Sequence, residues 1–422
     1  MSETRSTTPS LPSSSFQDVR QSLLSGQEIA LLDVREECLF AQAHPLFAAN
    51  LPVNRIAQDA PIRLPRRDTT LVLYDNGEGL AELALHQLTN MGYGRVSLLE
   101  GGLNGWISAG GEVFKDVNVP SKAFGELVES RRHTPSLSAQ EVRALLDQKA
   151  DLVVLDARRF DEYRTMSIPS AISVPGAELV LRAQALAPDP ATRIVVNCAG
   201  RTRSIIGTQS LLNAGIPNPV SALRNGTIGW TLAGEVLNHG AIGRFTDVSE
   251  SQRQQAAELA RAVADRADVK RIQLADLGAL LAEPHRTTYK FDVRTAEEFA
   301  AGHLAGFRHV PGGQLVQETD VSAPVRGARI VLADPEGVRD NMSASWLAQM
   351  GWEVWVLDGL TAADLRETGP GVTLAPVSAA GRYRRPYEGT DNPVEAIQAY
   401  LDWEYGLVDQ LGRDGTHGFW VL

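Results

Sequence analysis

Cysteine is scarce in this chain, because only Cys38 and Cys198 among its 422 residues carry a thiol. Two cysteines cannot build the disulfide framework of a small secreted domain, so we expect a reducing, cytoplasmic setting. The sequence also lacks any Cys-x-x-Cys pair, and its eight histidines include no His-x-x-x-His pair. These spacings are typical of metal sites, so no metal site is predicted.

Long apolar runs and an excess of positive charge are also missing. No stretch approaches the ~20 apolar residues of a membrane-spanning helix, so we expect no membrane association. The net charge is −11, from 51 acidic and 40 basic residues. That balance opposes general binding to nucleic acid or to anionic lipid. Residues 1–15 are rich in Ser, Thr and Pro and lack the apolar core of a signal peptide, which predicts a disordered lead.

The chain does contain a threefold internal repeat. The chain is longer than a domain with a single hydrophobic core, which predicts roughly two to four domains. In three places an apolar strand ends in an Asp-x-Arg turn, and a second apolar run closes further along the chain. The interval is 42 residues each time, from Asp33 to Asp75, from Asp156 to Cys198 and from Asp292 to Asp334. One spacing kept three times indicates one structural unit repeated.

Each copy alternates short apolar strands with helical patterns, which predicts α/β domains with right-handed crossovers. Runs that are apolar on both faces are typical of a mainly parallel sheet covered by helices. We place the three domains at roughly 16–118, 134–245 and 270–370, with a linking helix over residues 250–268.

The C-terminal extension, residues 379–422, repeats nothing upstream. Its aromatic side chains are costly to leave in water, so we expect the extension to dock on a domain or across a subunit boundary. A lid over the loop that begins at Cys198 is the sharper alternative, and a homodimer is compatible with the pattern. The aromatic residues are Tyr383, Tyr387, Tyr400, Trp403, Tyr405, Phe419 and Trp420.

The second copy carries the chemistry, because it alone has a thiol at the end of the second apolar run. Backbone N–H groups of a strand-to-helix loop form an anion cradle, and Arg201 and Arg203 add positive charge. Such surroundings lower a thiol pKa from about 8.5, which predicts a thiolate nucleophile beside a pocket for an anion. The predicted substrate-binding residues are Ala199, Gly200, Arg201, Thr202, Arg203, Ser204 and Arg158.

Two alternatives to these roles stay open. Cys198 could be a buried structural cysteine with solvated arginines around it, and Arg158 could serve only in salt bridges to nearby acids.

The other two copies place Asp75 and Asp334 at the thiol position. A carboxylate there repels an anion and cannot carry sulfur, so both outer copies are predicted to be inactive.

These residues resemble the rhodanese family of sulfurtransferases. The resemblance rests on the Asp-x-Arg turns, the run 298–304, the Gly-Trp pairs that end in Trp106 and Trp230, and the loop 198–203. It implies three tandem rhodanese-like domains, with Cys198 as a sulfur carrier that becomes a persulfide. It further implies that Arg203 and the loop N–H groups cradle the persulfide, that Arg201 guides the donor, and that no metal or organic cofactor takes part.

The substrates are less closely defined by the sequence. Two arginines favour an anionic donor such as thiosulfate, with glutathione persulfide as an open alternative. The acceptor could be cyanide, a thiol or a protein of a sulfur relay.

Two other functions remain as alternatives. Cysteine-based phosphatases and arsenate reductases place five residues between cysteine and arginine, whereas four separate Cys198 from Arg203. A persulfide- or oxidant-sensing protein that binds partners is the second, because a cysteine of low pKa also suits sensing.

Overall fold

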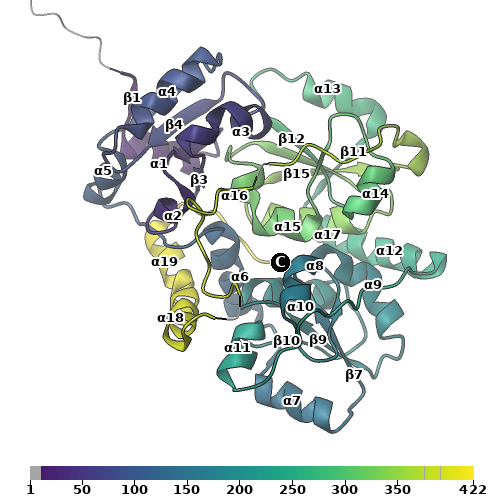
Figure 1. Ribbon diagram of the computed structural model, residues 1–422. Helices are drawn as coiled ribbons and strands as arrows, with labels where there is room; N and C mark the ends of the chain where they lie inside the picture. The colour runs from purple at the N-terminus through teal and green to yellow at the C-terminus, as the bar shows by residue number, and fades with distance from the viewer. Residues whose placement is uncertain (1–10, 375, 390) are drawn as a thin grey trace, which may run out of the picture. The chain divides into compact units, whose positions relative to one another are not determined.

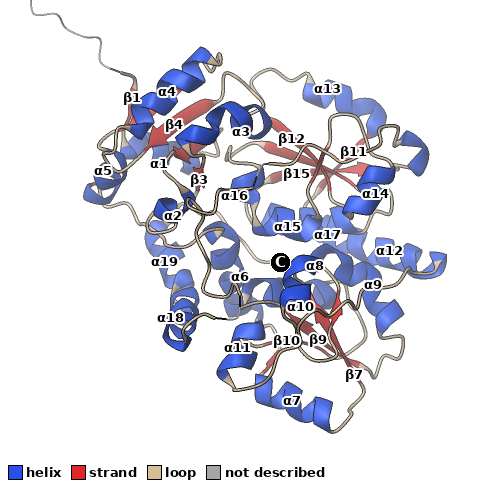
Figure 2. Ribbon diagram, in the orientation of Figure 1, coloured by secondary structure: helices blue, strands red, loops and turns tan. Residues whose placement is uncertain are grey.

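The computed structural model describes residues 11–374, 376–389 and 391–422. These residues form two compact units. The first unit extends to Val117 and includes Ala323–Gly327 and Pro376–Tyr383, and the second unit contains the remainder. The strands of the described residues form three five-stranded sheets, one in the first unit and two in the second (Figures 1 and 2). In each sheet the strands pair in parallel and follow one order, which confirms the predicted tandem α/β fold.

The first domain has the strand order β1-β5-β4-β2-β3. Its strands are β1 (Ser13–Ser14), β2 (Ile29–Asp33), β3 (Ala48–Asn50), β4 (Thr70–Tyr74) and β5 (Val96–Leu99). Its helices are α1 (Phe16–Leu24), α2 (Glu37–Phe40), η1 (Val53–Arg55), α3 (Ile56–Arg63), α4 (Leu80–Asn90) and α5 (Gly102–Ser108).

The second domain repeats that order as β6-β10-β9-β7-β8. Its strands are β6 (Ser136–Leu137), β7 (Leu152–Asp156), β8 (Ile172–Ser173), β9 (Arg193–Asn197) and β10 (Val220–Leu223). Its helices are α6 (Val119–Arg132), α7 (Ala139–Asp147), α8 (Phe160–Thr165), η2 (Gly176–Glu178), α9 (Leu179–Leu186), α10 (Thr202–Asn213) and α11 (Gly226–Leu232).

The third domain has the order β11-β15-β14-β12-β13. Its strands are β11 (Lys270–Gln273), β12 (Thr288–Asp292), β13 (Arg308–His309), β14 (Arg329–Ala333) and β15 (Glu353–Asp358). Its helices are α13 (Leu277–Leu281), α14 (Ala296–Ala301), α15 (Gly312–Gln317), α16 (Thr319–Ser322) and α17 (Arg339–Gln349), with η3 (Leu274–Asp276) and η4 (Ala362–Asp364). Helix α12 (Glu250–Arg266) precedes this domain, within the range predicted for a linking helix.

The sequence patterns missed the first strand of every sheet and misjudged the start of the chain. Residues 13–14, predicted to be disordered, form β1 and pair with β5. Ser15 then caps α1 through a hydrogen bond from the backbone N–H of Asp18. Strands β1 and β6 have two residues each, which carry too little periodicity to be recognised, and the four residues of β11 include a single apolar side chain. Residues 1–10 of the predicted lead lie outside the described part of the chain.

The C-terminal extension contributes two helices to the second unit. Helices α18 (Val394–Tyr405) and α19 (Leu407–Asp414) both pack on α6 (Figure 1). Phe419 reaches back to Phe124 of α6, where the two rings meet edge to face at 5.5 Å between centroids. In the described residues no helix is both long enough and apolar enough to cross a membrane.

The Asp-x-Arg turn is a buried ion pair that fixes the end of one strand in each domain. In the second domain, Arg158 Nε and Nη2 donate to the carboxylate of Asp156 at 2.9 and 2.7 Å. Arg158 Nη2 also donates to the carbonyl of Met166 at 2.6 Å, which closes the turn of α8. Arg35 and Arg294 make equivalent contacts in the outer domains. Because both charges are paired and hydrogen-bonded, the turn tolerates burial.

We predict that Asp292→Asn destabilises the second unit by about 3–5 kcal/mol, because it leaves the buried Arg294 without its counter-charge. Urea-induced unfolding measures the change. Arg143→Ala is the matched control, since that arginine pairs with Asp147 at an exposed site and should cost less than about 1 kcal/mol. Equal losses in the two variants would contradict this account of the turn.

Candidate functional site

Cys198 lies at the carboxyl end of β9, where the chain enters α10. Its side chain is 1% exposed, and its Sγ lies 3.4 Å from Ser204 Oγ. Helix α10 begins at Thr202, four residues after Cys198. The N terminus of α10 therefore lies directly under the loop, with its positive dipole end toward the thiol.

The start of α11 supports this loop from the other side. Thr227 N donates to the carbonyl of Cys198 at 2.9 Å, and Ile228 N donates to that of Ala199 at 3.0 Å. Only glycine fits at position 226, because its φ is +54° and a Cβ would lie 2.2 Å from the carbonyl oxygen of Cys198. The loop is thus held by backbone contacts at its first two residues.

Arg201 binds protein groups rather than facing an open pocket. Its guanidinium donates to both oxygens of Glu126 at 2.7 and 2.8 Å and also to Glu129. It further donates to Tyr405 Oη at 2.9 Å, and the Tyr405 ring lies 4.1 Å from its Cζ. The predicted role of guiding a donor anion is therefore not supported, because Arg201 is 3% exposed and fully engaged.

Arg203 lies on the first turn of α10 and pairs with Glu162 of α8. Its two terminal nitrogens donate to the two carboxylate oxygens at 2.8 and 2.9 Å. Although burial opposes ionisation, the Arg203 charge and these hydrogen bonds lower the pKa of Glu162 to about 2. Burial raises the pKa of Cys198, and the same guanidinium opposes that rise. Arg203 is thus paired with Glu162, and it also lines two of the cavities described below.

The C-terminal extension covers the loop. Ala199 belongs to an apolar cluster with Ile228 of α11 and four residues of the extension, which are Tyr387, Ile397, Tyr400 and Leu401. A Cβ at Gly200 would lie 3.3 Å from Glu404 Oε2 and 3.4 Å from Tyr400 Cε1. The extension therefore lies over the loop, as the lid alternative predicted, and Cys198 is buried beneath it.

This burial reverses the predicted effect on the thiol. Burial raises the pKa of Cys198, against the lowering effects of Arg203 and of the hydrogen bonds with Ser204, and the Glu404 carboxylate raises it further. The expectation of a lowered pKa is therefore wrong for the closed arrangement. The loop charges were identified from the sequence, but the desolvation and the carboxylate come from residues about 200 positions away.

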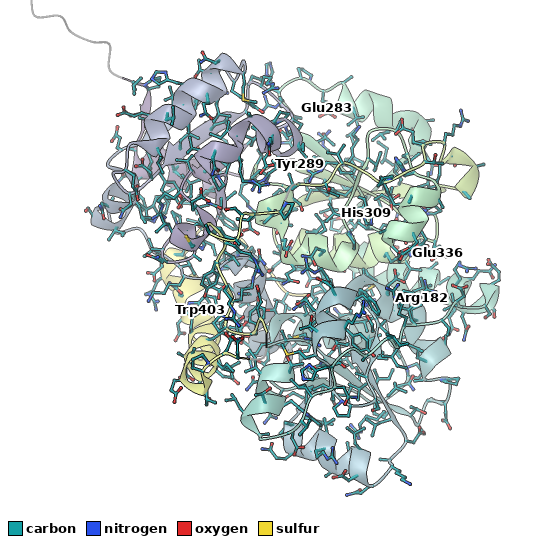
Figure 3. The ribbon with its side chains drawn as sticks, viewed as in Figure 1. Arg182, Glu283, Tyr289, His309, Glu336 and Trp403 are labelled. Carbon is teal, nitrogen blue, oxygen red and sulfur yellow. The ribbon has the colours of Figure 1, made fainter. Side chains whose placement is uncertain are left out.

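Glu404 is itself an unusual feature that the sequence patterns missed. It is 1% exposed, its Oε1 accepts from Tyr400 Oη at 2.7 Å, and its Oε2 has no hydrogen-bond partner among the described residues. Burial raises its pKa to about 7, an effect that the nearby Lys122 opposes. The Lys122 ammonium lies 5.1–5.5 Å from the ring centroids of three aromatics of the extension, which are Tyr387, Tyr400 and Trp403. Of these, Trp403 is labelled in Figure 3.

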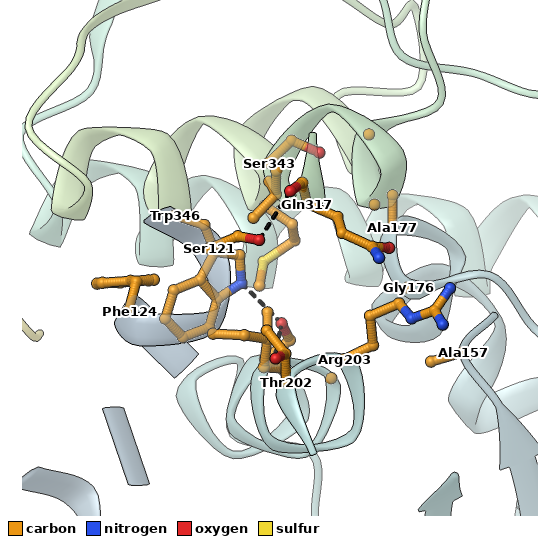
Figure 4. Close-up of a pocket in the computed structure, with 17 residues that line it drawn as sticks. Ser121, Phe124, Ala157, Gly176, Ala177, Thr202, Arg203, Gln317, Ser343 and Trp346 are labelled. Atoms are coloured by element: carbon orange, nitrogen blue, oxygen red, sulfur yellow. Dashed lines mark hydrogen bonds between the residues drawn. The ribbon is translucent and has the colours of Figure 1, made fainter. Parts of the chain in front are cut away.

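Three cavities adjoin the loop region, and Cys198 lines none of them. One of about 50 Å³ lies between α10 and α17 and is lined by Thr202, Arg203 and Trp346, with Ser121 Oγ donating to the carbonyl of Gln317 at its edge (Figure 4). A second of about 320 Å³ shares Arg203 and opens toward the third domain. A third of about 240 Å³ lies against Ile228, Tyr387 and Ile397.

The structure brings together most residues predicted to bind substrate, but it separates Arg158 from them. Ala199, Gly200, Thr202, Arg203 and Ser204 all lie in the loop or the first turn of α10. Arg158 is 1% exposed, and its polar contacts are those of the Asp-x-Arg turn. It therefore serves the turn, as the salt-bridge alternative held. Among the described residues no cluster of His, Cys, Asp or Glu could hold a metal ion.

In the first and third domains, the aspartate at the start of the loop binds the N–H groups of that loop. Asp75 accepts from the backbone N–H groups of Gly77 and Ala81 at 2.9 and 3.0 Å. Asp334 accepts from those of Glu336 and Arg339 at 3.1 and 2.9 Å. The carboxylate thus occupies the loop donors that would otherwise face an anion.

The third domain also keeps the arginine, but it uses that residue internally. Arg339 follows Asp334 at the interval that separates Arg203 from Cys198, and it pairs with Asp334 itself and with Glu298. The Arg339–Glu298 pair corresponds to the Arg203–Glu162 pair, and the partners lie 41 positions apart in both domains. That repeated interval could have revealed the pair from the sequence.

We predict that Cys198 is slow to react with iodoacetamide and that Tyr400→Ala speeds the reaction by about tenfold or more, since losing a buried ring weakens the cover. The measurement is the alkylation rate in a Cys38→Ser background, so that the label reports Cys198 alone. Asp402→Asn, an exposed change on the same helix, is the control. Equal rates in the three proteins would contradict the closed loop.

The raised pKa of Glu404 predicts a specific pH dependence of stability. Because the folded-state pKa of about 7 exceeds the ordinary glutamate value of 4.5, the folded chain binds more protons than the unfolded chain between those values. Stability should therefore fall as pH rises through that window, by an amount on the order of 3 kcal/mol. Glu404→Gln should flatten this decline in urea unfolding measured from about pH 4.5 to pH 8. An unchanged decline would show that the carboxyl ionises normally.

Comparison with known proteins assigns the three domains to one family. Residues 15–109, 138–233 and 274–361 match the family described as Rhodanese-like domain. A crystal structure of a thiosulfate sulfurtransferase from Pseudomonas aeruginosa is 53% identical, covers 98% of this chain and 100% of its own, and superposes with a TM-score of 0.95.

Two further relatives match single portions of the chain. An uncharacterized Synechocystis protein is 36% identical over 101 residues, which span 24% of this chain and 55% of that protein. The structure of the Alr3790 protein from Anabaena is 26% identical, covers 25% of this chain and 84% of its own, and has a TM-score of 0.24.

Proposed function

Because the chain belongs to the rhodanese family of sulfurtransferases, we propose that its second domain moves sulfur from thiosulfate to a thiol or cyanide through a persulfide on Cys198. The observation that carries this proposal is the contrast among the three equivalent loops. Asp75 and Asp334 fill their loop donors with their own carboxylates, whereas the thiol of Cys198 leaves its cradle to a ligand. The thiosulfate sulfurtransferase activity named for the Pseudomonas relative supports this choice of donor.

The first half of the reaction forms the persulfide. Cys198, once its proton has passed to solvent, attacks the outer sulfur of thiosulfate. The sulfur–sulfur bond of thiosulfate breaks, and sulfite leaves with the electron pair. Arg203 and the N–H groups at the start of α10 then stabilise the persulfide anion.

The second half regenerates the cysteine. An acceptor nucleophile attacks the outer sulfur of the persulfide, and the bond to Cys198 Sγ breaks with its electron pair returning to Cys198. Since the closed arrangement buries the thiol beneath Tyr400 and Glu404, donor and acceptor enter only when the extension moves off the loop. Its closure excludes water, which would otherwise compete for the hydrogen bonds to the persulfide.

Incubation with thiosulfate should add about 32 Da to the intact protein, the mass of one sulfur atom, and cyanide should remove it as thiocyanate. Cys198→Ser should show neither the gain nor thiocyanate release, whereas the control Cys38→Ser should behave as the wild type does. Intact mass spectrometry and thiocyanate detection are the measurements. A gain that persists in Cys198→Ser would contradict the assignment, and no gain with thiosulfate or glutathione persulfide would contradict the function.

A further inference from the structure

Glu404 presents an unused carboxylate oxygen to the loop that holds Cys198. Tyr400 Oη occupies Oε1 at 2.7 Å, while Oε2 has no partner among the described residues and lies 3.3 Å from the position of a Cβ built on Gly200. A buried carboxylate oxygen without a hydrogen bond is unfavourable. Its orientation toward Gly200 indicates that its partner is a group that binds over the loop.

The surroundings of Glu404 bring its pKa into the range where a carboxyl group can exchange a proton. Burial raises its pKa most strongly, and the charges around it then act in both directions, with a net result of about 7. A carboxyl group with a pKa near the working pH can accept a proton and release it again. The groups that face it are Lys122 and Glu126 of α6, Arg201 and Cys198 of the loop, and Tyr400 of its own helix.

We propose that Glu404 transfers the proton of a thiol acceptor in the second half of the reaction, an inference that rests on the Cys198 persulfide proposed above. The Glu404 carboxylate takes the thiol proton as the thiol sulfur attacks the outer sulfur of the persulfide. A bond forms between these two sulfurs, the bond from the outer sulfur to Cys198 Sγ breaks, and Cys198 leaves as a thiolate. Glu404 returns the proton to the transferred sulfur, so the step needs no oxidant and releases no net proton.

Only one substrate class requires this residue. A thiol is mostly protonated near neutral pH, because its pKa is about 8.5. Cyanide anion and thiosulfate bring no proton that must be removed before reaction. Glu404 should therefore favour thiol acceptors over cyanide, and its loss should change the balance between the two.

The test compares thiol and cyanide turnover in Glu404→Gln, which keeps the shape of the side chain and its acceptor for Tyr400. The probes are thiosulfate as donor, with dithiothreitol or with cyanide at a pH above the pKa of hydrogen cyanide. In Glu404→Gln, the rate of thiol turnover at neutral pH divided by the rate of cyanide turnover at that higher pH should fall by about 100-fold, the contribution typical of general acid–base catalysis. Asp402→Asn, an exposed carboxylate on the same helix, should keep the ratio of the wild type.

A pH profile distinguishes proton transfer from packing. The wild-type kcat/KM for the thiol should rise with an apparent pKa near 7, and Glu404→Gln should lose this rise. Tyr400→Phe should shift it to higher pH, because the Tyr400 hydrogen bond lowers the pKa of Glu404. A constant thiol-to-cyanide ratio in Glu404→Gln, or an unchanged rise, would overturn the inference while leaving the persulfide intact. Absence of a wild-type persulfide would instead overturn the proposed function and this inference with it.

Discussion

The guanidinium of Arg201 joins the three parts from which the site is built. It belongs to the loop after β9, and it binds Glu126 and Glu129 on α6 and Tyr405 at the end of α18. A buried arginine needs all of these partners, since an unpaired charge at 3% exposure would be strongly destabilising. The loop after β9, helix α6 and helix α18 must therefore assemble together. The closed cover over Cys198 is a consequence of that requirement.

The three domains have equivalent loops after their central strands. The contacts inside each loop follow from the residue at its first position. A carboxylate at this position binds the loop N–H groups itself, as Asp75 and Asp334 do. In the third domain it also captures Arg339, which would otherwise face an anion. A thiol accepts hydrogen bonds only weakly, and the Sγ of Cys198 lies 3.4 Å from Ser204 Oγ. The loop of Cys198 therefore differs from the two aspartate loops at this one position, and the proposed anion site in the second domain rests on that difference.

Local periodicity and repeated intervals predicted the parts of the fold that depend on neighbouring residues. The strands that end at Asp156 and Cys198 and the position of the active loop follow from such patterns. The role of Arg201 and the direction of the Cys198 pKa could not be predicted in this way. Arg201 is held by Glu126 and Tyr405, which are distant in sequence. Burial in the fold raises the Cys198 pKa most, and Glu404, which lies 206 positions after Cys198, raises it further. Residue types near a nucleophile indicate its chemistry, but its burial is decided by tertiary contacts.

Cys198 is buried in the closed structure, and we propose that the extension must move off the loop before Cys198 can react. The most direct measurement is the rate of Cys198 persulfide formation as the thiosulfate concentration is raised, followed by rapid quenching and mass spectrometry. The account predicts a rate that levels off at the opening rate of the extension, with a higher plateau in Tyr400→Ala. A rate that rises linearly with thiosulfate and is the same in both proteins would contradict it.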